Sequence, residues 1–271
     1  MRNRNSGWLE IMHPLGAAFQ LLSRFPVPVA IPFNNKVLRR SVVCYPLVGL
    51  AIGIVLAGAG WGLSWLLPPV PAAALLTGLW VMLTGGFHLD GLMDTADGVL
   101  SHRSREDMLA IMKDSRVGAM GAAACVLQLL MKFALLEGLL ESGWQNGVGL
   151  LPAVAIWSRW CMAAAVAWWP YARSGGGLGG LLSGFGGRQL AVCTVLAAGL
   201  SAGTGVWSGE AVQTGIVFAI ALGLPALGFS VLLARRLAAR LGGLTGDTYG
   251  AINELTETFL LLVILLAGRL L

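Results

Sequence analysis

Charged residues are scarce in this chain of 271 residues: Asp, Glu, Lys and Arg make up only 11% of it, whereas apolar residues make up 56%. A soluble domain usually carries about 25% charged residues. The composition therefore excludes an ordinary soluble domain and predicts an all-α protein embedded in a lipid bilayer. We expect no nucleic-acid partner behind the net charge of +5, because membrane topology accounts for the basic residues.

Cysteines are also few, and none of the four is spaced as Cys-x-x-Cys. They are Cys44, Cys125, Cys161 and Cys193, and each lies inside an apolar segment. This placement excludes a zinc site and a disulfide framework, and it predicts small buried side chains instead.

We expect no cleavable signal sequence in the N-terminal region. The apolar stretch at 8–22 is interrupted by Glu10 and His13 and is followed by Pro26 and Pro28. We expect an interfacial amphipathic helix that the two prolines bring to an end.

Long apolar runs are abundant, and each is long enough to cross about 30 Å of hydrocarbon. The predicted spans are 42–67, 72–89, 118–140, 148–168, 190–207, 212–234 and 252–271. They form a polytopic helical bundle of about seven spans in one membrane domain, 1–271. The second span is short, so a re-entrant or half-buried helix is its alternative. Assembly into a homo-oligomer stays open.

Basic residues are absent from every second connection between the predicted spans. The connections near 68–71, 141–147 and 208–211 contain no Lys or Arg, whereas the other connections and the N-terminal segment do. By the positive-inside rule the N-terminus is cytoplasmic and the C-terminus lies outside. The polar loops are then expected on the cytosolic face of the cytoplasmic (inner) membrane.

One polar stretch, residues 85–98, reads Gly-Gly-Phe-His-Leu-Asp-Gly-Leu-Met-Asp-Thr-Ala-Asp-Gly. A helix gathers its acids, Asp90, Asp94 and Asp97, within an arc of roughly 60°. Like charges on one stripe repel unless a cation neutralises them, and oxygen ligands select a hard ion. We therefore predict that the three acids bind Mg²⁺ or Mn²⁺. A solvated helix end bearing three acids is the alternative.

Basic residues follow this acidic stretch, at Arg103, Lys113 and Arg116. Acids that hold a divalent ion, next to cations, suit a ligand with several phosphates. Asp114 is a weaker metal-ligand candidate, and His88 adjoins the acids closely enough to contact a ligand. Ordinary membrane topology is the alternative explanation for Arg103.

A second polar stretch lies at 242–254, where Asp247 and Glu254 are spaced i, i+7. It is expected at the same membrane level as the acidic stretch, although a turn with a helix N-cap would also explain Asp247. Two cations fall inside apolar spans, where charge is costly. Arg159 is predicted to reach toward the acidic site, and Lys132 to pair with Glu137 or to extend to the interface.

The connection from 172 to 188 is rich in glycine. It suits a lid over a ligand or a nest of backbone N–H groups for phosphate, and a mobile connection is the alternative.

The order of these motifs resembles the cobalamin synthase family, whose members are adenosylcobinamide-GDP ribazoletransferases. The resemblance covers nearly the whole chain. Its motifs are Ser-Arg-Phe-Pro-Val-Pro at 23–28, Tyr-Pro-Leu-Val-Gly at 45–49, the acidic stretch at 85–98, Ile-Met-Lys-Asp-Ser-Arg at 111–116, Ser-Arg at 158–159, Tyr-Ala-Arg at 171–173, Gly-Leu-Gly at 177–179 and Thr-Gly-Asp-Thr at 245–248.

This resemblance implies an Mg²⁺-dependent integral membrane transferase acting on adenosylcobinamide-GDP and α-ribazole, or α-ribazole 5′-phosphate. The 5′-hydroxyl attacks the cobinamide-side phosphorus, GMP leaves, and adenosylcobalamin or its phosphate forms. The catalytic residues are then Asp90, Asp94, Asp97, Lys113 and Arg116; the substrate-binding residues are His88, Arg103, Arg159, Arg173, Asp247 and Glu254; and the metal ligands are Asp90, Asp94, Asp97 and Asp114. One carboxylate is expected to accept the hydroxyl proton.

Two other classes fit the sequence less well. A CDP-alcohol phosphotransferase would share the pattern that begins at Asp94-x-x-Asp97-Gly98, but Ser-His-Arg follows it at 101–103 and the second half of that motif is missing. A cation or solute transporter would place its acids near the bilayer midplane. Here the acids cluster beside basic residues at one predicted membrane face.

Overall fold

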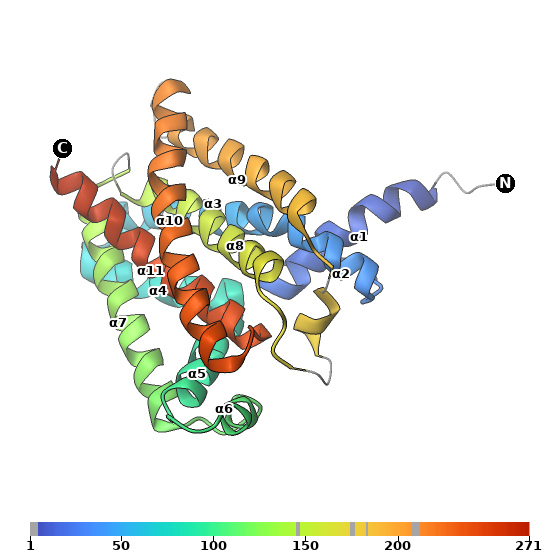
Figure 1. Cartoon of the computed structure of the whole chain (residues 1–271). Coiled ribbons are helices and arrows are strands. Elements are labelled where there is room, and N and C mark those ends of the chain that lie inside the picture. Colours follow the sequence, from blue (N-terminus) through green and yellow to red (C-terminus); the bar gives the residue numbers. More distant parts are fainter. Residues whose placement is uncertain (1–4, 145–146, 174–176, 183, 208–211, 271) are drawn as a thin grey trace.

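The computed structural model describes residues 5–144, 147–173, 177–182, 184–207 and 212–270. Over these residues it consists of helices and loops, and the single β-bridge that it contains joins Tyr171 to Leu244. The predicted all-α class is therefore confirmed, with the helices packed as one bundle (Figure 1).

Six helical segments of the described chain are long and apolar enough to cross a membrane. Their helices are α3 (Tyr45–Leu66, preceded by α2, Asn35–Ser41, and η1, Val42–Cys44), α7 (Ala119–Glu141), α8 (Leu151–Trp168, preceded by η2, Val148–Leu150), α9 (Gly187–Trp207), α10 (Val212–Leu241) and α11 (Gly246–Leu270). These correspond to six of the predicted spans and make the chain a multi-pass membrane protein.

The boundaries predicted for the second span, 72–89, need correction. Helix α4 (Pro69–Thr84) ends before the predicted end of this span at residue 89. After it, α5 (Phe87–Val99) continues at an angle of 89° to α4. Gly85 and Gly86 have φ angles of +66° and +71°, which glycine adopts without the steric cost that other residues meet. Helix α4 has 16 residues, about 24 Å by helix rise, and α5 lies outside the six spanning helices.

The N-terminal helix α1 (Asn5–Leu22) ends before the two prolines predicted to stop it. Ala17 and Ala18 of α1 are fully buried in the main core, so this part of the helix packs on the bundle and is not left at a lipid surface. After α1, the backbone N–H of Arg24 donates to the Leu83 carbonyl at 2.7 Å and ties the chain to α4.

Helix α8 lies at the centre of the bundle and packs against α3, α9, α10 and α11. Its residues from Leu151 to Ala165 are all buried. Gly49 and Gly53 of α3 face its backbone, and the three nearest atoms to a side chain at either position would be α8 backbone. This close packing holds α3 against α8, and α11 packs against α8 in turn.

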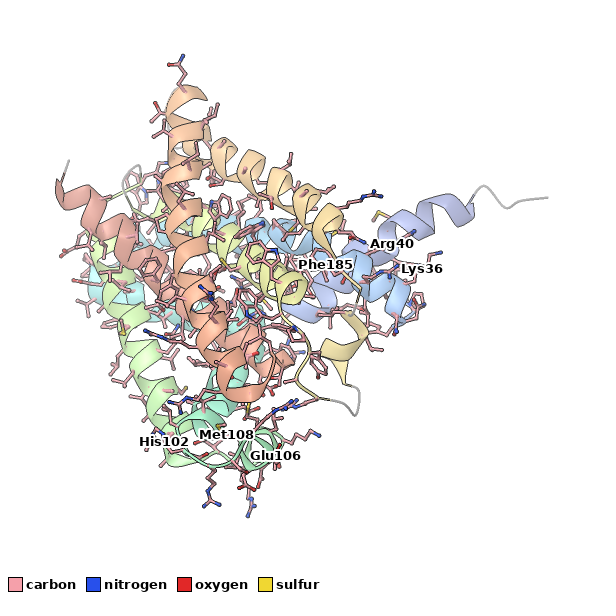
Figure 2. All side chains as sticks on the ribbon, in the orientation of Figure 1. Lys36, Arg40, His102, Glu106, Met108 and Phe185 are labelled. Carbon is pink, nitrogen blue, oxygen red and sulfur yellow. The ribbon has the colours of Figure 1, made fainter. Side chains whose placement is uncertain are left out.

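Two of the short helices lie at one end of the bundle, toward the bottom and right of Figure 1. There α6 (Arg105–Ile111) and η3 (Leu178–Leu182) lie near the first residues of α11 and the last of α10. Figure 2 labels Lys36 and Arg40 on α2 and Glu106 on α6, all on this side. The predicted polar loops thus share one end.

Candidate functional site

Helix α5 crosses the first turn of α11 at a point where both helices carry glycine. A Cβ on Gly91 would lie 2.7 Å from the Asp247 carbonyl oxygen, and one on Gly250 would lie 3.0 Å from the His88 carbonyl oxygen. Larger residues would push the helices apart. The close crossing places Asp90 and Asp247 beside the same pocket, as the two polar stretches predicted.

This pocket, which we call the carboxylate pocket, has a volume of about 250 Å³. It is lined by Phe87, Asp90, Gly91, Tyr171, Arg173, Gly177, Gly179, Gly246 and Asp247. The segment after α8 supplies one wall, because Leu244 donates to the Pro170 carbonyl at 2.9 Å and Ala172 donates to the Leu244 carbonyl at 2.8 Å. Two glycines of the predicted Gly-rich loop also line it; residues 174–176 and 183 lie outside the described chain.

Arg173 supplies the cation of the carboxylate pocket. Its Nη2 donates to Asp247 Oδ2 at 2.8 Å and to the Met112 carbonyl at 3.3 Å. The two side chains of the ion pair are 15% and 23% exposed, so this pair is screened less than a surface pair. An anionic ligand entering the pocket therefore meets a guanidinium already held in place.

Asp94 lies one turn along α5 from Asp90. Burial, followed by the negative charges of Asp90, Asp247 and Asp97, raises the pKa of the Asp94 carboxyl to about 6 against the opposing effect of Arg173. The acids are thus close enough to repel one another. A bound cation would relieve that repulsion and favour the charged carboxylates.

Asp97 faces a different partner from the other two acids of α5. Its two oxygens accept hydrogen bonds from the backbone N–H of Gly118 at 2.7 Å and of Gly121 at 2.8 Å. These groups belong to the start of α7, whose first N–H groups lack partners within the helix. The predicted metal ligand therefore caps α7 and anchors α5 to it.

Removing this cap is expected to destabilise the fold. Asp97→Ala leaves the first turn of α7 without its acceptor, and we expect a loss of about 0.5–2 kcal/mol, the usual cost of removing a helix cap. Thermal unfolding in detergent measures it. Ser142→Ala, in an exposed residue at the other end of α7, serves as the control. Equal stability of Asp97→Ala and wild type would contradict the capping role.

The carboxylate oxygens of this pocket are suitable ligands for a divalent ion, but the described residues do not supply a complete set of protein ligands. Among the described residues, no three His, Cys, Asp or Glu side chains gather into a group that could hold a metal. Mg²⁺ is usually held by one or two carboxylates together with substrate phosphates and water. Asp90 lines the carboxylate pocket, and Asp94 lies outside the lining but close enough to interact with the charges of Asp90, Asp247 and Arg173, so these two acids would meet that requirement.

The basic residues after α5 lie in exposed loops outside the lining of the carboxylate pocket. Arg103 and Lys113 are exposed, and Arg116 forms an ion pair with Asp114 at 2.5 Å. The hydrogen bonds from Arg116 lower the pKa of Asp114 to about 2. The phosphate-binding and metal-binding roles predicted for these four residues stay predictions.

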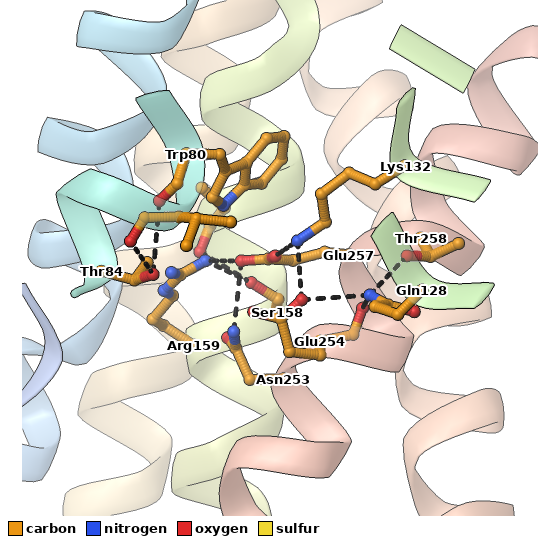
Figure 3. A network of polar contacts seen from close by, with 12 residues as sticks. Trp80, Thr84, Gln128, Lys132, Ser158, Arg159, Asn253, Glu254, Glu257 and Thr258 are labelled. Carbon is orange, nitrogen blue, oxygen red and sulfur yellow. Dashed lines mark hydrogen bonds and ion pairs between the residues drawn. The ribbon is translucent and has the colours of Figure 1, made fainter. Parts of the chain in front are cut away.

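A polar network is buried in the bundle interior, between α7, α8 and α11 (Figure 3). Lys132 donates to Glu254 at 2.7 Å and to Glu257 at 2.6 Å, and Arg159 pairs with Glu257. Gln128 donates to the Glu254 carboxylate at 3.0 Å. Two cations thus face two carboxylates, so the charges balance within the network.

This network corrects one predicted contact and relocates two predicted binding residues. The partners of Lys132 are Glu254 and Glu257 rather than Glu137. Arg159 is fully buried and Glu254 is 4% exposed, and neither lines the carboxylate pocket. Their predicted contact with substrate stays untested, and their observed role is to join three spanning helices.

His88 is also turned into the bundle. The His88 side chain is fully buried, and the His88 carbonyl oxygen is the atom that a Cβ on Gly250 would approach most closely. Neither ring nitrogen has a hydrogen-bond partner among the described residues. It does not line the carboxylate pocket. The predicted contact between His88 and a ligand stays a prediction.

The comparison with known proteins decides the family. The model of the family described as cobalamin-5-phosphate synthase matches residues 14–265, which include every residue of the carboxylate pocket. The chain belongs to the cobalamin-5-phosphate synthase family.

Curated relatives match nearly the full chain. A Brevibacillus brevis protein named adenosylcobinamide-GDP ribazoletransferase is 39% identical, over 91% of this chain and 95% of its own. Relatives of the same name from Pseudomonas aeruginosa and Roseiflexus are 41% and 38% identical, over 95% and 96% of this chain and 99% and 92% of their own lengths. No solved structure matches this chain.

The buried network of this cobalamin-5-phosphate synthase family member includes residues that were not predicted from the sequence, among them Glu257, Asn253 and Gln128. Glu257 lies one turn after Glu254 in an apolar span, and Asn253 donates to it at 3.2 Å. The signal was present, because charges inside a span require partners. Counting two in-span cations against Glu254 alone would have pointed to a second acid.

Proposed function

We propose that this chain transfers the adenosylcobinamide phosphate moiety of adenosylcobinamide-GDP to the 5′-hydroxyl of α-ribazole or α-ribazole 5′-phosphate. The products are GMP and adenosylcobalamin or its 5′-phosphate. The observation that carries the proposal is the pocket in which Asp90 and Asp247 face Arg173, within the region matched by the family model. The name shared by the relatives supplies the substrates.

In the proposed reaction, a bond forms between the acceptor 5′-oxygen and the cobinamide-side phosphorus. The bond from that phosphorus to the bridging oxygen of the pyrophosphate breaks, and the bridging oxygen leaves as part of GMP. The hydroxyl proton passes to a carboxylate of the pocket and then to solvent. Charge that develops on the phosphate oxygens needs positive groups held in advance.

Arg173 meets that need directly, because its ion pair with Asp247 holds the guanidinium at the pocket wall. Asp90 and Asp94 would hold Mg²⁺, with the substrate phosphates completing its coordination. When bound, Mg²⁺ supplies charge neutralisation for the pyrophosphate. Lys113, Arg116 and Arg103 lie in the exposed loops on either side of α6, at the same end of the bundle as α5, where they would attract the polyanionic substrate.

The proposed location is the cytoplasmic membrane, with the N-terminus in the cytoplasm and the carboxylate pocket on the cytosolic face. The support is the alternation of basic and non-basic connections in the sequence. Figure 1 places α5, α6, the start of α7 and the start of α11 toward one end of the bundle. A single orientation of the protein in the membrane would therefore put all of these elements on the same face.

Two substrate pairs test the proposal in detergent, with no ion gradient present. We expect the purified protein to release GMP from adenosylcobinamide-GDP when α-ribazole is added. We expect no CMP from CDP-diacylglycerol and glycerol 3-phosphate. CMP release without GMP release would move the chain to the CDP-alcohol phosphotransferases, and failure with both pairs would favour transport.

A further inference from the structure

A second cavity opens next to the carboxylate pocket and has no role in the transfer described so far. Its volume is about 340 Å³, within the range of small-molecule pockets. It is lined by Val166, Ala167, Trp168, Trp169, Pro170, Tyr171, Gly179, Gly184, Phe185 and Tyr249. Tyr171 and Gly179 line both cavities, so they form the wall between them.

Aromatic rings from three separate parts of the chain line this cavity. Trp168 and Trp169 end α8, with ring centroids 6.1 Å apart and planes at 64°. Phe185, labelled in Figure 2, comes from the segment between η3 and α9, and Tyr249 comes from the first turn of α11. Tyr171 completes the set from the loop after α8.

An aromatic belt at a membrane interface would explain part of this set, because Trp residues gather there. Trp168, which is 48% exposed, suits that explanation. Phe185 and Tyr249 do not suit it, since they are 4% and 5% exposed. Their rings face the protein interior, where they close one side of the cavity.

The shared wall links the aromatic cavity to the phosphate-binding groups. A Cβ on Gly179 would lie 2.5 Å from Cε2 of Tyr171, so only glycine there lets the ring keep this position. On the other side of the wall stand Arg173, Asp247 and Asp90. A nucleoside whose 5′-oxygen reaches these groups would extend its base past Tyr171.

We infer that this aromatic cavity binds the planar heteroaromatic base of a nucleoside substrate. Stacking on aromatic side chains tolerates different bases, because every base has a π-face. The inference rests on the proposed function, which brings two such bases to the site: the base of α-ribazole and the guanine of the leaving nucleotide. The shared chemistry is the same for both, and kinetics distinguish them.

The test compares Trp169→Leu and Trp168→Leu with Trp65→Leu. Trp65 is 76% exposed near the end of α3, so its loss controls for removing an indole. We expect KM for one nucleoside substrate to rise about 5- to 150-fold, equivalent to about 1–3 kcal/mol of stacking. We expect kcat to stay within about threefold of wild type. A rise for α-ribazole assigns the acceptor base, and a rise for adenosylcobinamide-GDP assigns guanine.

Trp169→Phe keeps a ring and is expected to recover most of the affinity. If Trp169→Leu does not fold, Trp168→Leu provides the test, because Trp168 is exposed and its replacement is expected to leave the fold intact. Equilibrium dialysis of α-ribazole and of GMP against the same proteins measures binding without turnover. Unchanged KM and unchanged binding for both nucleosides in folded variants would overturn the inference and leave an aromatic belt. No GMP release by wild type would instead refute the proposed function.

Discussion

Asp94→Asn is expected to lower the rate of GMP release by at least about 10²–10³-fold, the loss that follows removal of one group stabilising developing charge. The carboxylate of Asp94 lies in the combined field of Asp90, Asp247 and Arg173. Asn keeps the shape of the side chain but loses the charge that would hold Mg²⁺. Initial rates at saturating adenosylcobinamide-GDP and α-ribazole measure the effect.

Two controls accompany this substitution. Glu106→Gln removes an acid from the exposed face of α6, in the same end of the bundle (Figure 2), and should leave the rate within about twofold. The elution profile and thermal unfolding of Asp94→Asn should match those of wild type. A folded Asp94→Asn protein that keeps a third or more of the wild-type rate would remove Asp94 from the transfer.

Glu257→Gln is expected to destabilise the fold by about 3–5 kcal/mol, the usual cost of breaking a buried ion pair. Glu257 is fully buried and faces both Lys132 and Arg159. Without its charge, Glu254 alone opposes two buried cations, so one cation stays uncompensated. Thermal or denaturant unfolding of the protein in detergent measures the loss.

Charge balance makes a sharper prediction for the double variant. Lys132→Met with Glu257→Gln removes one charge of each sign, leaves Arg159 and Glu254, and should be more stable than Glu257→Gln alone. Glu137→Gln is the matched control in the same helix as Lys132, and it should change the stability by less than about 0.5 kcal/mol. A control as unstable as Glu257→Gln would contradict the observed pairing.

The spanning helices were predictable because apolar length is a local property of the sequence. Six predicted spans recur, although α10 extends beyond its predicted end at 234 to Leu241 and α11 begins at Gly246, before its predicted start at 252. A re-entrant or half-buried helix was the alternative given for the second span, but the position of the bend between α4 and α5 was not predicted. The apolar pattern continues from α4 as far as Leu89, and only the backbone shows that Gly85 and Gly86 both take positive φ angles.

The candidate site also contains features that the sequence predicted and features that only tertiary packing determines. The sequence predicted that the second polar stretch lies at the same membrane level as the acids of α5, whereas only the crossing at Gly91 shows that Asp90 and Asp247 line one pocket. Helical spacing also placed Asp97 with Asp90, but it could not show that the start of α7 takes up its oxygens. Such competition for a side chain depends on tertiary packing.

For the buried network, the sequence showed that charged side chains need partners but did not show which residues those partners are. Charge inside an apolar span indicated that Arg159 and Lys132 need partners. Glu137, five residues away on the same helix, was the partner predicted for Lys132, whereas the actual partners lie on α11. Only the packing of α7 and α8 against α11 decides that pairing.

The most direct test of the central claim is metal-dependent product formation by the wild-type protein in detergent. The protein receives adenosylcobinamide-GDP and α-ribazole, with Mg²⁺ or with EDTA in excess. The account predicts equal amounts of GMP and adenosylcobalamin with Mg²⁺, none with EDTA, and recovery when Mg²⁺ is restored. Equal product formation in EDTA, or GMP without a cobalamin product, would contradict it.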